Sequence, residues 1–210
     1  MLRIGKSEKF WDNRAKEYEK KEIKWEKIYN KAVEETKQYL NSNDIVLDYA
    51  CGTGIITAQV AGYVKEIQAI DISSKMIDIA KRITNDRQIK NINFAQATIF
   101  EESFEKESFN VILAFNVLHL LEDTEKVIQR INELLKPGGL FISETACMRE
   151  KKSFLSIFLF FLSKIRVVPY IRFLKFSELE SLIVNEKFQI VESRNLDQTS
   201  PTYYVVAKKS

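Results

Sequence analysis

The stretch Ile45 to Gly54, IVLDYACGTG, constrains this chain more than any other. Apolar and β-branched residues lead into Asp48, a run of small residues follows, and Ile55 opens a helical pattern. This order predicts a strand, a tight turn and a helix, because glycines allow positive φ and let a ligand approach bare backbone. The start of the helix also offers unpaired N–H groups.

The turn differs from the common phosphate-binding turns. A dinucleotide-binding turn continues as G-x-G-x-x-G, whereas Thr57 stands in place of the third glycine here, and the Walker lysine is missing. Asp48 would repel a pyrophosphate but attract an ammonium or sulfonium group. The chemistry therefore predicts a cationic nucleoside as the ligand.

These residues resemble the first motif of the class I S-adenosylmethionine-dependent methyltransferases. That motif usually reads acidic-x-Gly-x-Gly-x-Gly, and residues 48–54 read DYACGTG, so that Ala50 takes the first glycine position and slightly narrows the room beside the cofactor. The resemblance implies S-adenosyl-L-methionine as cofactor and S-adenosyl-L-homocysteine as its product. The turn residues expected at the cofactor are Asp48, Ala50, Cys51, Gly52 and Gly54.

Asp71 ends the next predicted strand, residues 66–71. It lies about twenty residues beyond the turn, the separation at which a carboxylate reaches ribose hydroxyls. Its alternative role is to cap the helix predicted at residues 74–84. The resemblance favours ribose binding and implies that Ile72 and Met76 flank the adenine.

The strand predicted at residues 91–95 leads into a turn where the family commonly carries a Gly-Asp pair. Ala97 and Thr98 stand there in this chain. Because a hydroxyl is a weaker acceptor than a carboxylate, we expect Thr98 or the backbone of Ile99 to contact the adenine amino group.

Phe109 to Phe115 is a nearly continuous apolar run, which predicts a strand covered on both faces. Phe115 and Asn116 end this strand and are expected at the cofactor, since open α/β sheets bind ligands at the carboxyl ends of their strands. The segment lacks the Asn/Asp-Pro-Pro-aromatic signature of methyltransferases that act on amide or base nitrogens. An amine of DNA is therefore a poor candidate acceptor.

His119, the single histidine, follows in a loop expected to face the acceptor. It has the pKa of a general base for a hydroxyl or amine acceptor. The alternative is a packing or substrate-contact residue, and the sequence leaves both open.

Residues 7–40 predict two amphipathic helices, with Ser7 as the first cap. Residues 10–18 resemble the segment that many small-molecule methyltransferases fold over the cofactor, which places Tyr18 near its methionine end. Alternatively, Phe10, Trp11 and Tyr18 only dock this helix on the core.

Residues 154–162, FLSIFLFFL, are apolar almost all round, which is unlike a surface helix, and the run is too short for a membrane span. The resemblance places a variable lid over the acceptor pocket here. We favour a pocket lining or a homodimer contact over peripheral membrane contact through residues 154–174. Whether these residues line a pocket, form a dimer contact or meet a membrane, they imply an apolar acceptor.

The remaining pattern predicts a helix at 124–135, a strand at 140–145, a helix at 177–185 with Ser177 and Glu180 spaced as a capping box, and closing strands at 188–193 and 203–207. The fold class is α/β: a Rossmann-like, doubly wound, seven-stranded sheet, mostly parallel with a C-terminal antiparallel strand and helices on both faces. One domain spans residues 1–210, divided into a helical cap (1–43), a cofactor-binding core (44–146), a hydrophobic lid insert (147–176) and a C-terminal helix with closing strands (177–210).

Composition limits the function further. The net charge of +3 is too weak to predict a nucleic-acid partner. Cys51 and Cys147 read as reduced thiols in a cytoplasmic protein, and no metal site is expected.

The sequence thus predicts a methyltransferase for a small, apolar acceptor. The alternatives are a membrane-associated quinone or lipid methyltransferase and a non-catalytic protein that binds S-adenosylmethionine.

Overall fold

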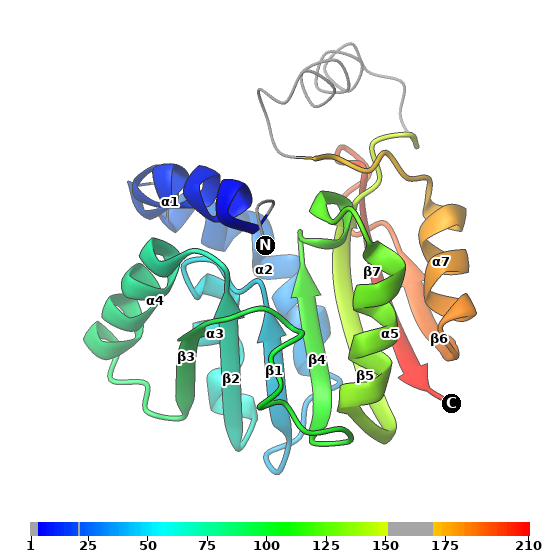
Figure 1. The fold of residues 1–210 in the computed structure, drawn as a ribbon, viewed down its shortest axis with the longest axis horizontal. Helices are drawn as coiled ribbons and strands as arrows, with labels where there is room; N and C mark the ends of the chain where they lie inside the picture. The colour runs from blue at the N-terminus through cyan, green and yellow to red at the C-terminus, as the bar shows by residue number, and fades with distance from the viewer. Residues whose placement is uncertain (1–3, 21, 151–169) are drawn as a thin grey trace.

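The computed structural model describes residues 4–20, 22–150 and 170–210. A seven-stranded sheet with the order β3-β2-β1-β4-β5-β7-β6 forms its centre (Figure 1). Strands β1 to β5 pair in parallel, and β7 runs antiparallel to both β5 and β6. The predicted doubly wound sheet is confirmed, and its strand order reverses between β1 and β4. The strands are β1 (Ile45–Tyr49), β2 (Glu66–Asp71), β3 (Ile92–Gln96), β4 (Phe109–Phe115), β5 (Leu135–Ala146), β6 (Phe188–Arg194) and β7 (Thr202–Lys209).

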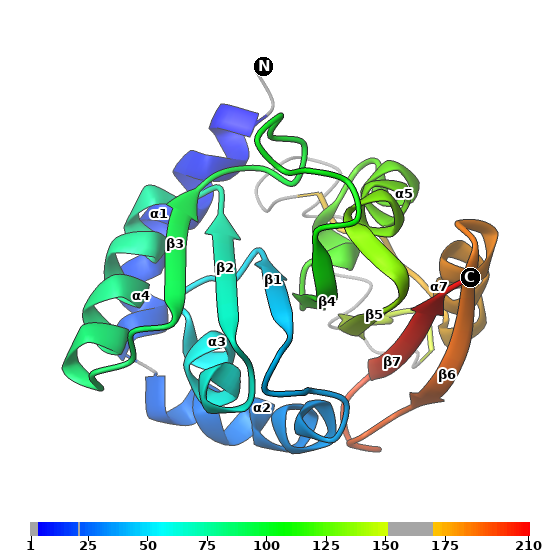
Figure 2. The same cartoon turned by 90° about the horizontal axis from the view of Figure 1, so that it is seen from below.

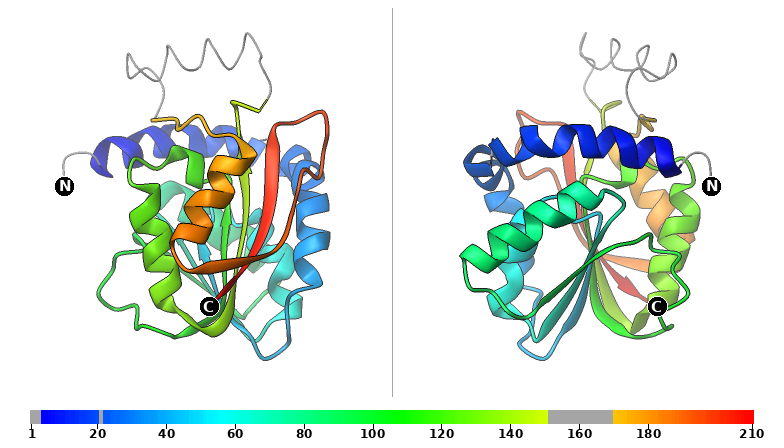
Figure 3. Two further views of the ribbon diagram at one scale, coloured as in Figure 1. Left: turned by 90° about the vertical axis from the view of Figure 1, so that its right-hand side faces the viewer. Right: turned by 60° about the vertical axis from the view of Figure 1, so that its left-hand side comes forward.

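Helices cover both faces of the sheet (Figure 2). Helices α2, α3 and α4 lie on one face and α5 and α7 on the other, while α1 lies across the carboxyl edge of the sheet beside α4 (Figure 3). The helices are α1 (Ile4–Lys20), α2 (Glu22–Lys37), α3 (Ile55–Val60), α4 (Ser74–Asp86), α5 (Thr124–Leu134) and α7 (Phe176–Asn185), with short 3₁₀ turns η1 (Ala61–Tyr63) and η2 (Leu118–Leu120).

The core consists of two large apolar clusters, one on each face of the sheet. In β4, Val111 and Leu113 belong to the cluster that contains residues of α2 and α3. Ile112 and Ala114 belong to the cluster that contains residues of α5 and α7. A strand covered on both faces is apolar at nearly every position, which is why the β4 sequence, apart from Asn110, lacks polar alternation.

Two predicted helix caps are wrong. Helix α1 begins at Ile4, so Ser7 lies inside it. Helix α7 begins at Phe176 after Lys175, whose backbone N–H donates to the Glu178 carboxylate at 2.8 Å. Phe176, the first residue of α7, stacks on Tyr203 with ring centroids 4.1 Å apart. The helix therefore starts one residue before Ser177.

Residues 154–162, on which the lid prediction rests, lie outside the described residues, and so do residues 163–169. The two described ends of this segment meet in space. The Arg149 N–H donates to the Leu174 carbonyl at 3.0 Å, and the Arg172 N–H donates to the His119 carbonyl at 2.7 Å. Residues 149 and 174 are thus held together, and Arg172 is held at His119. Within the described ranges, every helix is too short or too polar to cross a membrane.

Candidate active site

The glycine-rich turn joins β1 to α3 at the carboxyl edge of the sheet. Gly52 and Gly54 have φ values of 56° and 72°, as the sequence predicts. A Cβ added at Gly54 would lie 2.9 Å from the Cβ of Ala80, so this glycine is needed for packing against α4. A Cβ added at Gly52 would meet nothing within 4 Å. Gly52 therefore borders open space in which a ligand can lie against the backbone.

Ala50 also has a left-handed backbone, with φ of 59°. This conformation costs an L-residue about 1–2 kcal/mol relative to the right-handed one, whereas glycine adopts it freely. The sequence indicated only a small loss of room at Ala50. The structure adds a physical reason why the family motif has glycine at this position.

Asp71 ends β2 and bridges to the turn. Its carboxylate accepts the Gly52 N–H at 2.9 Å and the Ser73 N–H at 2.8 Å. Burial raises its pKa, and the two N–H donors oppose that rise. Each carboxylate oxygen has a second lone pair, so both can still accept ribose hydroxyls. The alternative role as a helix cap falls to Ser73, whose hydroxyl accepts the Met76 N–H at 3.1 Å.

Asp48 lies buried beneath the turn. The Thr57 hydroxyl donates to its carboxylate at 2.5 Å. Burial raises the pKa of Asp48 to about 7; the bond from Thr57 lowers it and the charge of Asp71 raises it. A bound cation would favour the ionised form. Sequence reasoning took Thr57 only as a missing glycine and overlooked this contact.

The predicted adenine side of the site is only partly assembled. The Ala97 N–H donates to the Asp71 carbonyl at 3.0 Å, which sets this turn beside β2. The Thr98 hydroxyl accepts the Phe100 N–H at 3.3 Å, and the Ile99 carbonyl accepts from Arg130 at 3.3 Å. Adenine contacts at Thr98 and Ile99 therefore stay predictions.

Ile72 and Met76, which are also expected beside the adenine, contact β3 and α1. The Ile72 carbonyl accepts from the Gln96 amide at 3.0 Å. Met76 is buried in a small cluster with Ala15 of α1. Their contact with adenine also stays a prediction.

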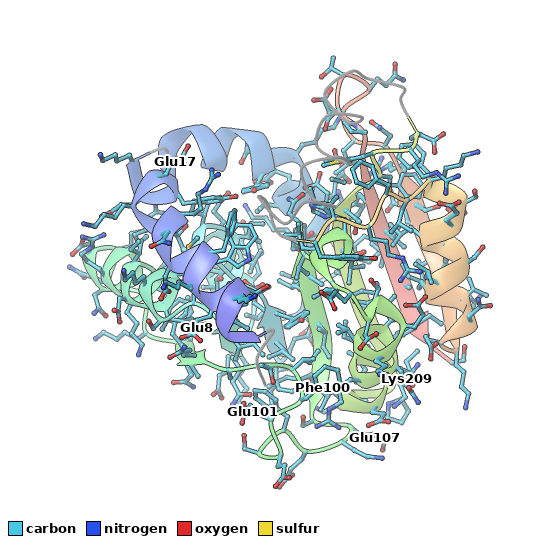
Figure 4. All side chains as sticks on the ribbon, turned by 45° about the horizontal axis from the view of Figure 1, so that its top comes forward. Glu8, Glu17, Phe100, Glu101, Glu107 and Lys209 are labelled. Carbon is cyan, nitrogen blue, oxygen red and sulfur yellow. The ribbon has the colours of Figure 1, made fainter. Side chains whose placement is uncertain are left out.

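Helix α1 is held to the start of α4. Its Asp12 carboxylate accepts the Ser73 hydroxyl at 2.6 Å, and its Glu8 accepts from Gln96 at 2.9 Å. Figure 4 shows Glu8 on α1, which lies over α4. Tyr18 and Trp11 meet edge to face, with ring centroids 6.3 Å apart, and pack on the same small cluster. This contact fits the alternative in which Tyr18 only docks the helix on the core. The approach of Tyr18 to a cofactor stays a prediction.

Polar side chains meet at the carboxyl ends of β4 and β5. Phe115 is buried, and Asn116 follows with φ of 54°. The Asn116 N–H donates to the Glu144 carbonyl at 2.7 Å. Burial raises the pKa of the Glu144 carboxyl group, and the polar side chains of Asn116 and Thr202 lower it. Sequence reasoning missed Glu144. The available signal was one acidic residue near the end of an apolar strand.

His119 differs from its prediction. It lies in the short turn η2 with 7% of its surface exposed, whereas the sequence predicted a loop that faces the acceptor. Its Nδ1 has no hydrogen-bond partner among the described residues. Burial lowers its pKa to about 4, which leaves a neutral and weakly basic imidazole. Its role as a general base stays a prediction.

The arrangement fits a cationic nucleoside. Gly52 offers open backbone, Asp71 offers carboxylate oxygens beside it, and the charge of Asp48 lies beneath the same turn. Hydroxyls and a positive charge are the groups that these three residues would bind.

Comparison with known proteins adds the following matches. A family model described as a methyltransferase domain matches residues 40–165. The ubiquinone biosynthesis O-methyltransferase of Rickettsia typhi is 30% identical over 166 residues, which cover 75% of this chain and 66% of that relative's length. A SAM-dependent methyltransferase from Aquifex aeolicus has a similar fold, with a TM-score of 0.67 at 15% identity over 85% of this chain and 89% of that one. The cyclase SpnF is similar as well, with a TM-score of 0.67 at 16% identity over 81% of this chain and 76% of that one.

Proposed function

The chain belongs to the methyltransferase family whose model matches residues 40–165, and from this premise we propose that it transfers a methyl group from S-adenosyl-L-methionine to a small acceptor. One observation carries the proposal. The Asp71 carboxylate is fixed by the Gly52 N–H beside space that is open at Gly52. A ribose with two adjacent hydroxyls matches a carboxylate held in this way.

The chain's residues would act by binding and alignment. Asp71 orients the ribose, the Gly52 backbone leaves room beside it, and Asp48 places negative charge beneath the positively charged end of the cofactor. When bound, the cofactor supplies an electrophilic methyl group on a sulfonium. Most of the rate acceleration then comes from holding the acceptor in line with that methyl group and from excluding water. Helix α1, which lies across the carboxyl edge of the sheet (Figure 3), helps to exclude the water.

For the acceptor we propose a small and largely apolar molecule. The apolar sequence at residues 154–162 supports this, and so does the Rickettsia typhi relative, whose name places it in ubiquinone biosynthesis. The similar fold of a cyclase means that fold alone does not decide the reaction. A quinone-like acceptor bound at a membrane surface is the alternative that the relative's name favours.

Calorimetric binding of S-adenosyl-L-methionine tests the cofactor assignment. We expect Asp71→Ala to weaken binding at least tenfold, about 1.4 kcal/mol. Glu66→Gln is the matched control, because Glu66 lies at the amino end of the same strand and accepts from Asn93 at 2.7 Å. A folded wild-type protein that binds no cofactor would overturn the proposal, and unchanged binding by Asp71→Ala would overturn the role of Asp71.

A further inference from the structure

A buried carboxyl group lies one strand beyond the proposed cofactor turn. Glu144 is on β5, in register with Phe115 of the parallel strand β4 and with Tyr204 of the antiparallel strand β7. Only 8% of its surface is exposed. It therefore lies near the carboxyl ends of two parallel strands, the edge at which open α/β sheets bind ligands.

Neighbouring strands place polar groups near this carboxyl group. The side chains of Asn116, after β4, and Thr202, at the start of β7, lower its pKa against the larger effect of burial. The Asn116 N–H also donates to the Glu144 carbonyl at 2.7 Å, and Asn116 adopts a left-handed backbone to do so. Because Asn116 follows the last residue of β4, Glu144 adjoins a residue that the sequence predicts at the cofactor.

Burial is the main cause of the shifted pKa of Glu144, which it raises to about 7. The polar side chains of Asn116 and Thr202 lower this pKa, and the charge of Asp197 in the loop before β7 raises it. On the α2 side, Tyr29 has its pKa raised by burial, then by Tyr18 of α1 and by Glu144 itself. No cation is among the groups that shift this carboxyl.

On the premise of the proposed methyltransferase function, we infer that Glu144 is the catalytic residue that accepts the proton of the acceptor, and that the acceptor carries a hydroxyl group, for which catechol is the probe. An ionised carboxylate only accepts hydrogen bonds, so it selects an acceptor that donates one. The acceptor oxygen gains the methyl group, its O–H bond breaks, and its proton passes to Glu144. The sulfur keeps the electron pair of the broken S–C bond, and Glu144 then returns the proton to water.

This assignment separates Glu144 from His119, for which the sequence leaves open a role as base or as a packing or substrate-contact residue. The two environments shift the groups in opposite directions. Burial lowers the pKa of His119 to about 4, whereas that of Glu144 rises to about 7. A base is most effective when its pKa lies near the working pH, and Glu144 meets that condition.

Calorimetric binding of catechol to the protein saturated with S-adenosyl-L-homocysteine tests the inference without turnover. Between pH 6 and pH 8 a group of pKa about 7 goes from about one tenth to nine tenths ionised, so wild-type affinity for catechol should rise about tenfold. Glu144→Gln keeps the shape of the side chain and should remove this pH dependence while weakening binding at pH 8 at least fivefold. Glu66→Gln should behave as wild type. Veratrole, in which both hydroxyls are methylated, should bind wild type and Glu144→Gln equally.

The outcomes separate the inference from the function on which it rests. Catechol binding that is equal in wild type and Glu144→Gln, or absent from a wild type that binds the homocysteine product, overturns the role of Glu144 and leaves the cofactor proposal standing. A wild type that fails to bind the product overturns both. For any phenol that is turned over, the rise of kcat with pH through about 7 should disappear in Glu144→Gln and persist in His119→Asn.

Discussion

At the scale of single residues, the two glycines of the turn are needed for different reasons: Gly52 for ligand binding and Gly54 for packing. Gly52→Ala places a methyl group in open space, so we expect a loss of stability of about 1–2 kcal/mol from its left-handed backbone and a much larger loss of cofactor binding. Gly54→Ala adds a clash with Ala80 and should destabilise the fold by at least about 3 kcal/mol. Urea denaturation and calorimetry of both variants measure the contrast. Equal stability losses, or cofactor binding retained by Gly52→Ala, would contradict it.

Ala50 offers a gain of stability at the same turn. Its φ of 59° suits glycine, so Ala50→Gly should raise the free energy of unfolding by up to about 1 kcal/mol, reduced by the greater freedom of glycine in the unfolded chain. Thermal denaturation measures the change. A lower melting temperature would mean that the side-chain packing of Ala50 outweighs the backbone strain.

Asp48 should make stability depend on pH. Its pKa of about 7 in the folded protein exceeds the ordinary 3.8, so between these values the folded state binds more protons than the unfolded state. Stability from this group therefore falls as pH rises from about 4 to 7 and is constant above, with an upper limit of about 4 kcal/mol. Asp48→Asn should be more stable than wild type at pH 8, by at least about 2–4 °C in melting temperature, and should bind the cofactor less tightly. Equal melting temperatures of the two proteins at pH 5 and pH 8 would show that Asp48 stays charged at no cost.

At the scale of elements, α1 is a separate unit joined to α4. Its apolar contacts form a small cluster distinct from the two large ones, and Asp12 accepts the Ser73 hydroxyl at the start of α4. Asp12→Ala should increase hydrogen exchange in residues 4–20 while leaving strand β1 protected. Glu17→Ala is the control, because Glu17, which Figure 4 labels, is exposed on the same helix. It pairs there with Arg14. Unchanged exchange in α1, or faster exchange throughout, would contradict this independence.

The elements also show where sequence reasoning stops. The strands and helices were predictable because burial on both faces or on one stripe leaves a periodic record along the chain. The contact of Glu144 with Asn116 was not, because it depends on the pairing of β4 with β5, to which sequence spacing gives no direct guide. Ser177 and Glu180 have the spacing of a capping box, yet Glu178 and Lys175 form the cap. A short pattern of this kind also occurs where tertiary contacts such as Phe176 on Tyr203 decide the helix start.

At the scale of the whole molecule, the candidate site belongs to the sheet that both large apolar clusters share. Residues of β1, β4 and β5 contribute to clusters on opposite faces, so we expect them to unfold in one transition. A ligand bound at the carboxyl edge of these strands should then stabilise that transition as a unit. At one hundred times its dissociation constant, S-adenosyl-L-homocysteine should add about 2.7 kcal/mol, which is about 5–11 °C in melting temperature for a chain of this size.

Scanning calorimetry with and without the ligand measures this coupling, and Gly52→Ala, whose added methyl group blocks the turn, is the control that should show no shift. A shift confined to one of two resolved transitions would mean that the cofactor edge and the rest of the sheet unfold separately. A full shift in Gly52→Ala would place the ligand away from the turn. A single transition shifted only in proteins with an open turn is the expected result, because the site and the central strands of the core are the same elements.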